Sequence, residues 1–361
     1  MSSTKRERIV NSHNEWDPLE EVIVGSLDGA CVPPWDAAYR AMIPAESVEM
    51  VEAFHRAHGA RRFEEARLGE ARQELDEFVR VLKAEGVVVR RPEGIDHAQS
   101  FSTPDFASPS GNAQSNPRDV LIVIGDEIIE ANMGWRSRYF EFRAYRKLVM
   151  EYFEQGARWT SAPKAMLSDR SYNPAYDKRT ERVLTEEEPV FDAADISRFG
   201  RDLFFQRSHV SNRKASQWLQ RHLGDGYRVH LVEFEDDRAV HIDATFAPLA
   251  PGKLLVNPDR PMRNMPDMFR RAGWELLVCP RTTYPSDRPE YRSFEWLHLN
   301  VLSLDAERVI VEKHEEPLIR QLRDWGFTPI PVAFRSNYKH GGSFHCATVD
   351  VRRQGTLESY F

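Results

Sequence analysis

One arrangement of segments recurs along the chain and constrains its fold more than any other feature. Each unit has short apolar runs typical of strands, then a stretch with helical spacing, then a glycine and one more apolar run. The glycines between helix and strand are Gly86, Gly156, Gly224, Gly273 and Gly326. Glycine commonly ends a helix because it adopts the left-handed conformation without steric cost. The pattern predicts an α/β fold built from five strand–strand–helix–strand units.

The segments of these units can be assigned by residue range. The first unit has one leading strand, at 19–25, then amphipathic helix between 47 and 85 and a strand from 87. The other four units have two leading strands, a helix and a final strand. They are predicted at 120–125, 127–130, 139–154 and 158–160; at 189–191, 202–205, 215–223 and 227–234; at 244–249, 254–257, 267–271 and 274–279; and at 296–303, 309–312, 317–325 and 327–333.

The strand missing from the first unit has a candidate at the C-terminal end. Residues 344–351 include a polar–apolar alternation that indicates a strand, and this strand could pair with residues 19–25. Such pairing would close the five units into a ring, which predicts a pseudo-symmetric five-bladed α/β-propeller and a single domain over residues 1–361. The spacing of the units is uneven, so an ordinary doubly wound α/β fold remains the alternative.

Composition excludes several classes of protein. The net charge of −7 gives no basic footprint for nucleic acid. Three scattered cysteines are too few for a disulfide scaffold, which favours a reduced, cytoplasmic protein. No signal peptide, membrane-spanning run, metal-binding motif or glycine-rich phosphate loop is apparent, so no cofactor is expected. The oligomeric state is left open, with a homodimer as one option.

The stretch from His340 to Arg353 is the strongest candidate for a reactive site. Gly341 and Gly342 suit a sharp turn or a close approach to a ligand, and Cys346 follows just before the predicted strand. A cysteine at such a junction is well placed to act as a nucleophile. The alternative is a half-buried structural cysteine before an edge strand.

Three further loops at strand ends carry acidic residues or a histidine. They are residues 116–119, 191–195 and 240–243, which contain Asp119, Asp192 and the pair His241 and Asp243. Each could be only a turn or cap residue. Together with Cys346 they form a set in which a thiol attacks, a histidine moves protons and an aspartate orients the histidine. Asp119 and Asp243 would suit a cationic substrate, and the long loop at 94–118 could help exclude water.

These motifs resemble those of the arginine-dependent amidinotransferases. The resemblance is carried by residues 340–353, 191–195, 240–246, 257–260, 116–119 and 135–146, and it extends from about His13 to the C-terminus. This family includes glycine amidinotransferase and bacterial enzymes of antibiotic and toxin pathways. The family fold, the five-bladed pentein α/β-propeller, agrees with the five units marked by glycines.

The resemblance implies a role for each matching residue. Cys346 corresponds to the family nucleophile, His241 to the general acid/base and Asp192 to the aspartate that supports the histidine. Asp119 and Asp243 correspond to carboxylates that hold the guanidinium group. The remaining two positions concern the other end of the substrate: Arg260 corresponds to an arginine that binds a carboxylate, and Ser293 to a serine nearby.

The chain departs from the glycine amidinotransferases at three positions. Val240 stands where these enzymes have methionine, Ser343 where they have a third glycine, and Phe294 where they have a second serine. The changes lie at the acceptor end, so they put glycine as the acceptor in doubt and leave the arginine chemistry intact.

The implied reaction moves the amidino group of L-arginine through an amidino-cysteine to a primary amine and releases L-ornithine. Lysine, glycine or a natural-product amine would be the acceptor. One alternative is a guanidine hydrolase of the arginine deiminase type, which would share the fold and the cysteine. A non-catalytic binding module is the other, although it would not need a cysteine, a histidine and an aspartate at matching positions.

Overall fold

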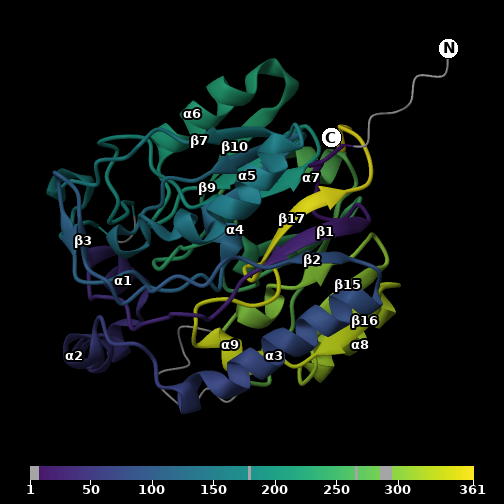
Figure 1. The fold of residues 1–361 in the computed structure, drawn as a ribbon. Coiled ribbons are helices and arrows are strands. Elements are labelled where there is room, and N and C mark those ends of the chain that lie inside the picture. Colours follow the sequence, from purple (N-terminus) through teal and green to yellow (C-terminus); the bar gives the residue numbers. More distant parts are fainter. Residues whose placement is uncertain (1–7, 178–179, 265–266, 285–294) are drawn as a thin grey trace.

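In the part of the chain that the structure describes, five three-stranded sheets form most of the β-structure. Figure 1 shows how these elements are arranged. The computed structural model describes residues 8–177, 180–264, 267–284 and 295–361. In each sheet the first two strands are antiparallel, and the third is parallel to the second and follows a helix. The chain therefore has the α/β character that the sequence predicts.

The bounds of the elements are as follows. The five sheets are β17 (Thr348–Arg353), β1 (Leu19–Val24) and β2 (Val88–Arg90); β5 (Leu121–Ile124), β6 (Glu127–Glu130) and β7 (Arg158–Ser161); β8 (Ile196–Phe199), β9 (Asp202–Gln206) and β10 (Arg228–Val232); β11 (Phe246–Ala250), β12 (Lys253–Val256) and β13 (Glu275–Val278); and β14 (Leu302–Ser303), β15 (Arg308–Glu312) and β16 (Thr328–Val332). The helices are α1 (Ala37–Met42), α2 (Val48–His58), α3 (Glu65–Ala84), α4 (Pro117–Val120), α5 (Arg146–Glu154), α6 (Arg213–Leu223), α7 (Asp267–Arg271), α8 (Glu316–Asp324) and α9 (Arg335–Tyr338).

The five helix-to-strand glycines lie where the repeated pattern places them. Each has a positive φ, between 67° and 105°, which an L-residue with a side chain adopts only with strain. The helices before them bury one face. In α3 the buried positions are Leu68, Ala71, Leu75, Phe78 and Leu82, spaced by three and four residues as an amphipathic helix requires.

The C-terminal strand pairs with the first strand of the chain. In Figure 1 the yellow β17 lies beside the purple β1, with Val24 opposite Thr348 and Val22 opposite Asp350. The strand begins at Thr348 and not at residue 344, because residues 344–347 form a turn. In that turn Ala347 N–H donates to Ser343 O and Thr348 N–H donates to His345 O.

Two predicted leading strands are wrong in position. Residues 189–191 form no strand, and the leading strand of that sheet is β8. The amides of Val190 and Phe191 donate to the side chains of Asn212 and Asn132, so these buried residues satisfy their backbone without a sheet partner. Likewise, only Leu302 and Ser303 of the predicted strand at 296–303 pair, because residues 297–299 form a turn of 3₁₀-helix.

Two other segments are more divided than the sequence suggests. The predicted helix at 139–154 is a 3₁₀ segment at Glu141–Tyr145 followed by α5. The long loop at 94–118 contains a short hairpin of β3 (Phe101–Ser102) and β4 (Ala107–Ser108), and its last two residues begin α4. No helix in the described part of the chain has the length and apolar character needed to cross a membrane.

Neighbouring sheets contact each other through their first strands or the segments beside them. β17 lies against β5, the 3₁₀ turn before β8 lies against β5, and β8 lies against β11. The hydroxyl of Ser303 donates to Leu249 O, which links β14 with β11. Leu19 N–H donates to Leu304 O at 2.8 Å, which links the first and fifth sheets.

A buried group of ions lies among these first strands. Asp350 accepts hydrogen bonds from Arg118 at 2.6 Å, Arg198 at 2.7 Å and Arg353 at 2.7 Å, and Glu15 pairs with Arg198 at 2.6 Å. The arginines hold the pKa of Asp350 well below its usual range despite the opposing effect of burial. Arg118 also donates from its backbone and its Nε to the carbonyls of residues 346 and 345. The cluster therefore joins β17 and β8 to α4 and to the turn that carries Cys346.

Replacing Asp350 by asparagine should destabilise the protein by about 3–5 kcal/mol, because three buried guanidinium groups would lose their shared counter-charge. The free energy of unfolding in urea measures this effect. Asp267→Asn is the matched control, because this carboxylate pairs with Arg270 at the surface and should cost less than about 1 kcal/mol. Equal effects of the two substitutions would show that the buried cluster is not a special source of stability.

Candidate active site

Cys346 lies in the turn between α9 and β17 and is 2% exposed. Its thiol lies 3.3 Å from Asp243 Oδ2, and Asn300 Nδ2 donates to the sulfur at 3.2 Å. The backbone N–H of Cys346 donates to Asn300 Oδ1, so one asparagine side chain holds both the backbone and the sulfur. A side chain at Gly342 would come within 2.4 Å of Asn116 Oδ1 and 2.8 Å of Cys346 Cβ, which explains the glycine at this position.

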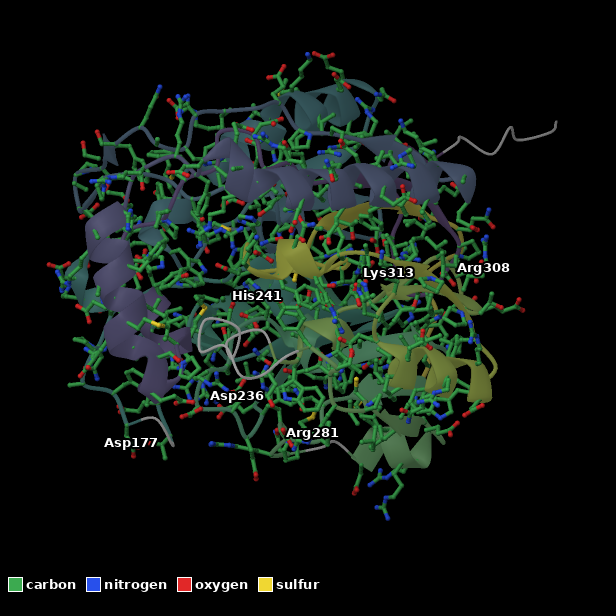
Figure 2. The ribbon with its side chains drawn as sticks, turned by 90° about the horizontal axis from the view of Figure 1, so that it is seen from below. Asp177, Asp236, His241, Arg281, Arg308 and Lys313 are labelled. Carbon is green, nitrogen blue, oxygen red and sulfur yellow. The ribbon has the colours of Figure 1, made fainter. Side chains whose placement is uncertain are left out.

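His241 is held between two carboxylates. Its Nε2 lies 3.0 Å from Asp192 Oδ2 and its Nδ1 lies 3.4 Å from Asp119 Oδ1. Burial disfavours the imidazolium, but the charge of Asp119 and the hydrogen bond to Asp192 outweigh it and raise the pKa of His241. His241 has a φ of 55°, a conformation that non-glycine residues rarely adopt outside functional sites. Figure 2 shows its position near the middle of the molecule in that view.

Asp192 is fixed by three donors. Besides His241, it accepts hydrogen bonds from the backbone N–H of Gly134 and the indole Nε1 of Trp135, both at 2.7 Å. With both oxygens so occupied and the side chain fully buried, the carboxylate can hold the histidine in one orientation.

Asp119 and Asp243 each have one carboxylate oxygen that accepts a hydrogen bond and one that accepts none within the described residues, although Asp119 Oδ1 lies 3.4 Å from His241 Nδ1 as an ion pair. Arg138 donates to Asp119 Oδ2 at 2.6 Å, and His345 Nδ1 donates to Asp243 Oδ2 at 2.7 Å. Within the described residues, Oδ1 of each aspartate is buried and has no hydrogen bond. Buried carboxylate oxygens without donors are costly, so these two suit a ligand that brings several N–H groups.

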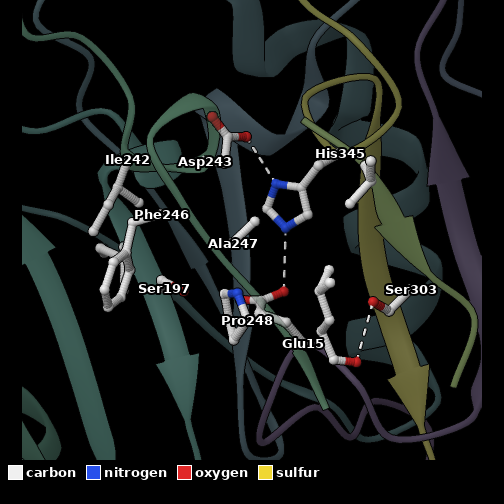
Figure 3. Close-up of a pocket in the computed structure, with 12 residues that line it drawn as sticks. Glu15, Ser197, Ile242, Asp243, Phe246, Ala247, Pro248, Ser303 and His345 are labelled. Atoms are coloured by element: carbon white, nitrogen blue, oxygen red, sulfur yellow. Dashed lines mark hydrogen bonds and ion pairs between the residues drawn. The ribbon is translucent and has the colours of Figure 1, made fainter. Parts of the chain in front are cut away.

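The groups that bind Asp119 and Asp243 each pair with a second carboxylate. Arg138 forms a second, bidentate pair with Glu141 at 2.6 and 2.8 Å. Burial raises the pKa of Glu141 to about 7 against the opposing charge of Arg138. On the other side, His345 Nε2 lies 3.2 Å from Glu15 Oε2, so the ring bridges Asp243 and Glu15 (Figure 3). The bridge connects the thiol's neighbour Asp243 to the buried ion cluster.

A small enclosed cavity lies beside this bridge. Its volume is about 20 Å³, and its lining includes Glu15, Ser197, Asp243 and His345 (Figure 3). This is room for a single water molecule next to polar partners.

The main cavity, of about 600 Å³, has Cys346 in its lining. Asp119, Arg138, His241 and Asp243 line the same space. This volume is within the range of pockets that bind small molecules. Asn112, Ala113 and Asn116 from the long loop also contribute to the wall, together with other residues described below.

The surroundings of the thiol favour its protonated form. Burial first, and then the charge of Asp243, raise the pKa of Cys346 to about 12, while His241 opposes the shift. A cation bound at Asp119 and Asp243 would offset the carboxylate charge and favour the thiolate.

Arg260 also lines the cavity. Its Nε lies 3.1 Å from Asp236 Oδ2, and its Nη1 lies 3.4 Å from Thr245 Oγ1. Burial, partly opposed by Asp236, lowers the pKa of Arg260. The predicted Ser293 and the neighbouring Phe294 lie outside the described residues.

The structure thus brings five of the predicted site residues together: Cys346, His241, Asp192, Asp119 and Asp243. Sequence reasoning missed the residues that hold them, chiefly Asn300, Arg138 and His345. The pairing of Arg138 with Glu141 could have been predicted, because these opposite charges stand three residues apart in the aromatic stretch 135–146. No such pattern indicated Asn300.

Comparisons with known proteins give close similarities. The chain is 48% identical over 356 residues to an L-arginine:L-lysine amidinotransferase of Pseudomonas savastanoi pv. phaseolicola, with 97% of this chain and 96% of the relative covered. It is 44% identical over 369 residues to mitochondrial glycine amidinotransferase of Danio rerio, with 99% and 86% covered. A solved structure of an amidinotransferase of the saxitoxin biosynthetic pathway from Microseira wollei superimposes with a TM-score of 0.93 at 48% identity, covering 98% and 99% of the two chains. No protein-family model matches the chain.

Proposed function

The chain belongs to the amidinotransferases, and we propose that it transfers the amidino group of L-arginine to a primary amine and releases L-ornithine. The transfer passes through a covalent amidino-cysteine at Cys346. One observation carries the proposal: Cys346, His241, Asp119 and Asp243 line a single cavity, and within the described residues each of the two aspartates has a buried oxygen that accepts no hydrogen bond. The thiol would supply the nucleophile, the imidazole a proton, and the carboxylates a site for a guanidinium cation.

In the first step, the guanidinium of arginine binds with its N–H groups on Asp119 and Asp243. Its positive charge promotes loss of the thiol proton to solvent, and the Cys346 thiolate attacks the guanidinium carbon. The imidazolium of His241 donates its proton to the departing nitrogen. The bond from carbon to that nitrogen breaks, ornithine leaves, and an amidino group remains on the sulfur.

In the second step, the acceptor amine attacks the same carbon and His241, now neutral, takes a proton from it. The carbon–sulfur bond breaks and the thiolate is regenerated. All proton transfers in both steps use His241 and solvent, so the scheme calls for no cofactor. A thiol that must stay reduced suits the cytoplasm. A homodimer stays a prediction.

We propose Arg260 as the partner of the α-carboxylate of arginine, with Ser293 nearby. An arginine side chain binds a carboxylate through two parallel hydrogen bonds, and Arg260 lies on the same cavity as Cys346. Asp236 already occupies Nε, and Nη1 makes only a long hydrogen bond to Thr245 Oγ1 at 3.4 Å, so a ligand would bind through the terminal nitrogens.

We also propose that the five sheets close into a single five-bladed α/β-propeller domain over residues 1–361. Support comes from the contacts that follow one another from sheet to sheet and return from Leu304 to Leu19. The burial of the strands agrees, since first strands such as β5 and β8 are wholly buried, whereas last strands such as β7 and β13 are largely exposed.

The acceptor should be a longer amine than glycine. Val240 lines the cavity in place of methionine, and Phe294 stands where glycine amidinotransferases have serine. We expect kcat/KM to be higher for lysine than for glycine with saturating arginine, by a factor within the roughly 10–200-fold that one reshaped pocket gives. Glycine as the best substrate by about tenfold or more would overturn this specificity.

The same assay separates transfer from hydrolysis. Mass spectrometry of the products should show ornithine and a guanidino form of the amine in equal amounts. Citrulline or ammonia formed at the same rate with and without amine would instead identify a hydrolase of the arginine deiminase type.

A further inference from the structure

Part of the main cavity is lined by residues that have no role in the proposed transfer. An apolar wall comes from α1, α2 and the segment after α2. It consists of Tyr39, Met42, Val51, Phe54 and Phe63, all partly exposed toward the cavity they line. Arginine needs apolar surface only for its short alkyl chain, so this wall is available to another ligand.

A distal cationic patch adjoins the wall. It consists of the two cations Arg67 and Lys339 and the imidazole of His340 beside them, all of which line the cavity. The guanidinium carbon of Arg67 lies 5.2 Å from the ring centre of Phe54 and 5.4 Å from that of Phe63. The ring of Phe63 lies 5.3 Å from that of His340. The wall and the patch therefore form one continuous surface.

The cations of this patch have no counter-charge among the residues that the structure describes. Within the described residues, neither Arg67 nor Lys339 has an ion-pair partner, whereas Arg260 is paired with Asp236 at 3.1 Å. His340 Nε2 is buried and has no hydrogen-bond partner there. Burial, followed by the charges of Lys339 and Arg67, lowers the pKa of His340 to about 3, so its ring is neutral and its Nε2 can donate to an anion.

A short turn connects the patch to the nucleophile. Gly341 and Gly342 follow His340 directly, and Asn116 Nδ2 donates to His340 O at 3.1 Å while its side chain lies against Gly342. Gly342 is also packed against Cys346. A ligand with one end at Cys346 can therefore extend along the wall to the patch inside the same cavity.

We propose that the apolar wall and the distal cationic patch bind the far end of the acceptor: a primary amine that carries an anionic group, carboxylate or phosphate, at the end of an apolar chain. The inference rests on the proposed transfer. The amine end reaches the amidino-cysteine, the hydrocarbon chain covers the wall, and the anion receives hydrogen bonds from the patch.

The first test compares acceptors of one chain length that differ only at the far end. Straight-chain ω-amino acids, ω-aminoalkyl phosphates and ω-amino alcohols are offered with saturating arginine. We expect kcat/KM for the anionic amines to exceed that for the alcohol by about tenfold or more, the effect of one charged hydrogen bond. The phosphate and carboxylate series separate the two sources of the anion, and the preference should weaken as salt is added.

The second test asks whether substitutions in the distal cationic patch remove the preference for anionic acceptors. In the double variant Arg67→Gln, Lys339→Gln, the ratio of anionic to neutral acceptor should fall to less than about threefold. Arg80→Gln is the matched control, because Arg80 lies on the same helix α3, is 72% exposed and does not line the cavity. If the double variant fails to fold, the single variants are tested in its place. Inorganic phosphate should then also inhibit the wild-type enzyme competitively with the acceptor.

The outcomes distinguish this inference from the proposed transfer. Formation of the amidino adduct on arginine alone, followed by equal rates with anionic and neutral amines, would overturn the subsite and leave the transfer intact. Failure to form the adduct would refute the transfer. An anion preference that survives in the double variant would also contradict the assignment to Arg67 and Lys339.

Discussion

Replacing Cys346 by alanine should abolish amidino transfer, with a loss in kcat on the order of 10⁴-fold or more. The thiol lines the same cavity as His241, Asp119 and Asp243, and its sulfur lies 3.3 Å from Asp243 Oδ2. The change removes the attacking atom and leaves the carboxylates that bind the guanidinium. Ornithine release from arginine measures the effect.

Cys279→Ala is the matched control. Cys279 is equally buried, contacts His298 at 3.4 Å and does not line the cavity, so its variant should retain activity within about threefold. Arginine should still raise the melting temperature of the Cys346→Ala protein, because ligand binding stabilises the folded state. Activity above about a tenth of wild type in Cys346→Ala would be incompatible with a covalent route.

Replacing His241 by asparagine should lower kcat by about 10²–10⁴-fold and change the KM for arginine much less. Both ring nitrogens face carboxylates, which stabilise the protonated ring. The imidazolium therefore carries a proton that it can donate when ornithine leaves. Asparagine can keep a hydrogen bond to Asp192 and tolerates a positive φ better than most residues, but it cannot carry a proton.

The control for this variant is His230→Asn. His230 also contacts an aspartate, with Nε2 2.6 Å from Asp202 Oδ1, but it lies on β10 and away from the cavity lining. Its activity should stay within about threefold of wild type. A fall of less than about threefold in His241→Asn would reduce His241 to a structural histidine.

The repeated architecture was accessible from the sequence because it depends on local signals. The glycines at helix ends, the amphipathic spacing of α3 and the alternation after Cys346 each act within a few residues. The structure confirms the strand–strand–helix–strand units. The wrong strand at 189–191 had apolar residues of the right kind, but the amides there are satisfied by Asn132 and Asn212, which are distant in sequence.

The site shows the same division between local and long-range information. The residues that a motif places at a loop, such as Cys346 and His241, could be named from the sequence. Their supports could not, because Asn300 is 46 residues from Cys346 and Glu15 is 330 residues from His345. These groups come together only because different sheets pack against one another. No periodic pattern in the sequence indicates such contacts.

The distal cationic patch likewise could not be predicted from the sequence alone. Arg67 is one of many charged residues on an amphipathic helix, and Lys339 precedes the glycine turn. Their significance comes from sharing a cavity with Cys346 and from the absence of a carboxylate partner in the described part of the chain.

The most direct test of the account is the mass of the enzyme after incubation with arginine and no acceptor. We predict that acid quenching within one turnover will leave an added amidino group on the intact protein, and that peptide mapping will place it on Cys346. Ornithine should appear in the same molar amount, and an added amine should remove the group from the protein. An unmodified protein under these conditions, with no adduct on the Cys346 peptide while arginine is consumed, would contradict the covalent transfer.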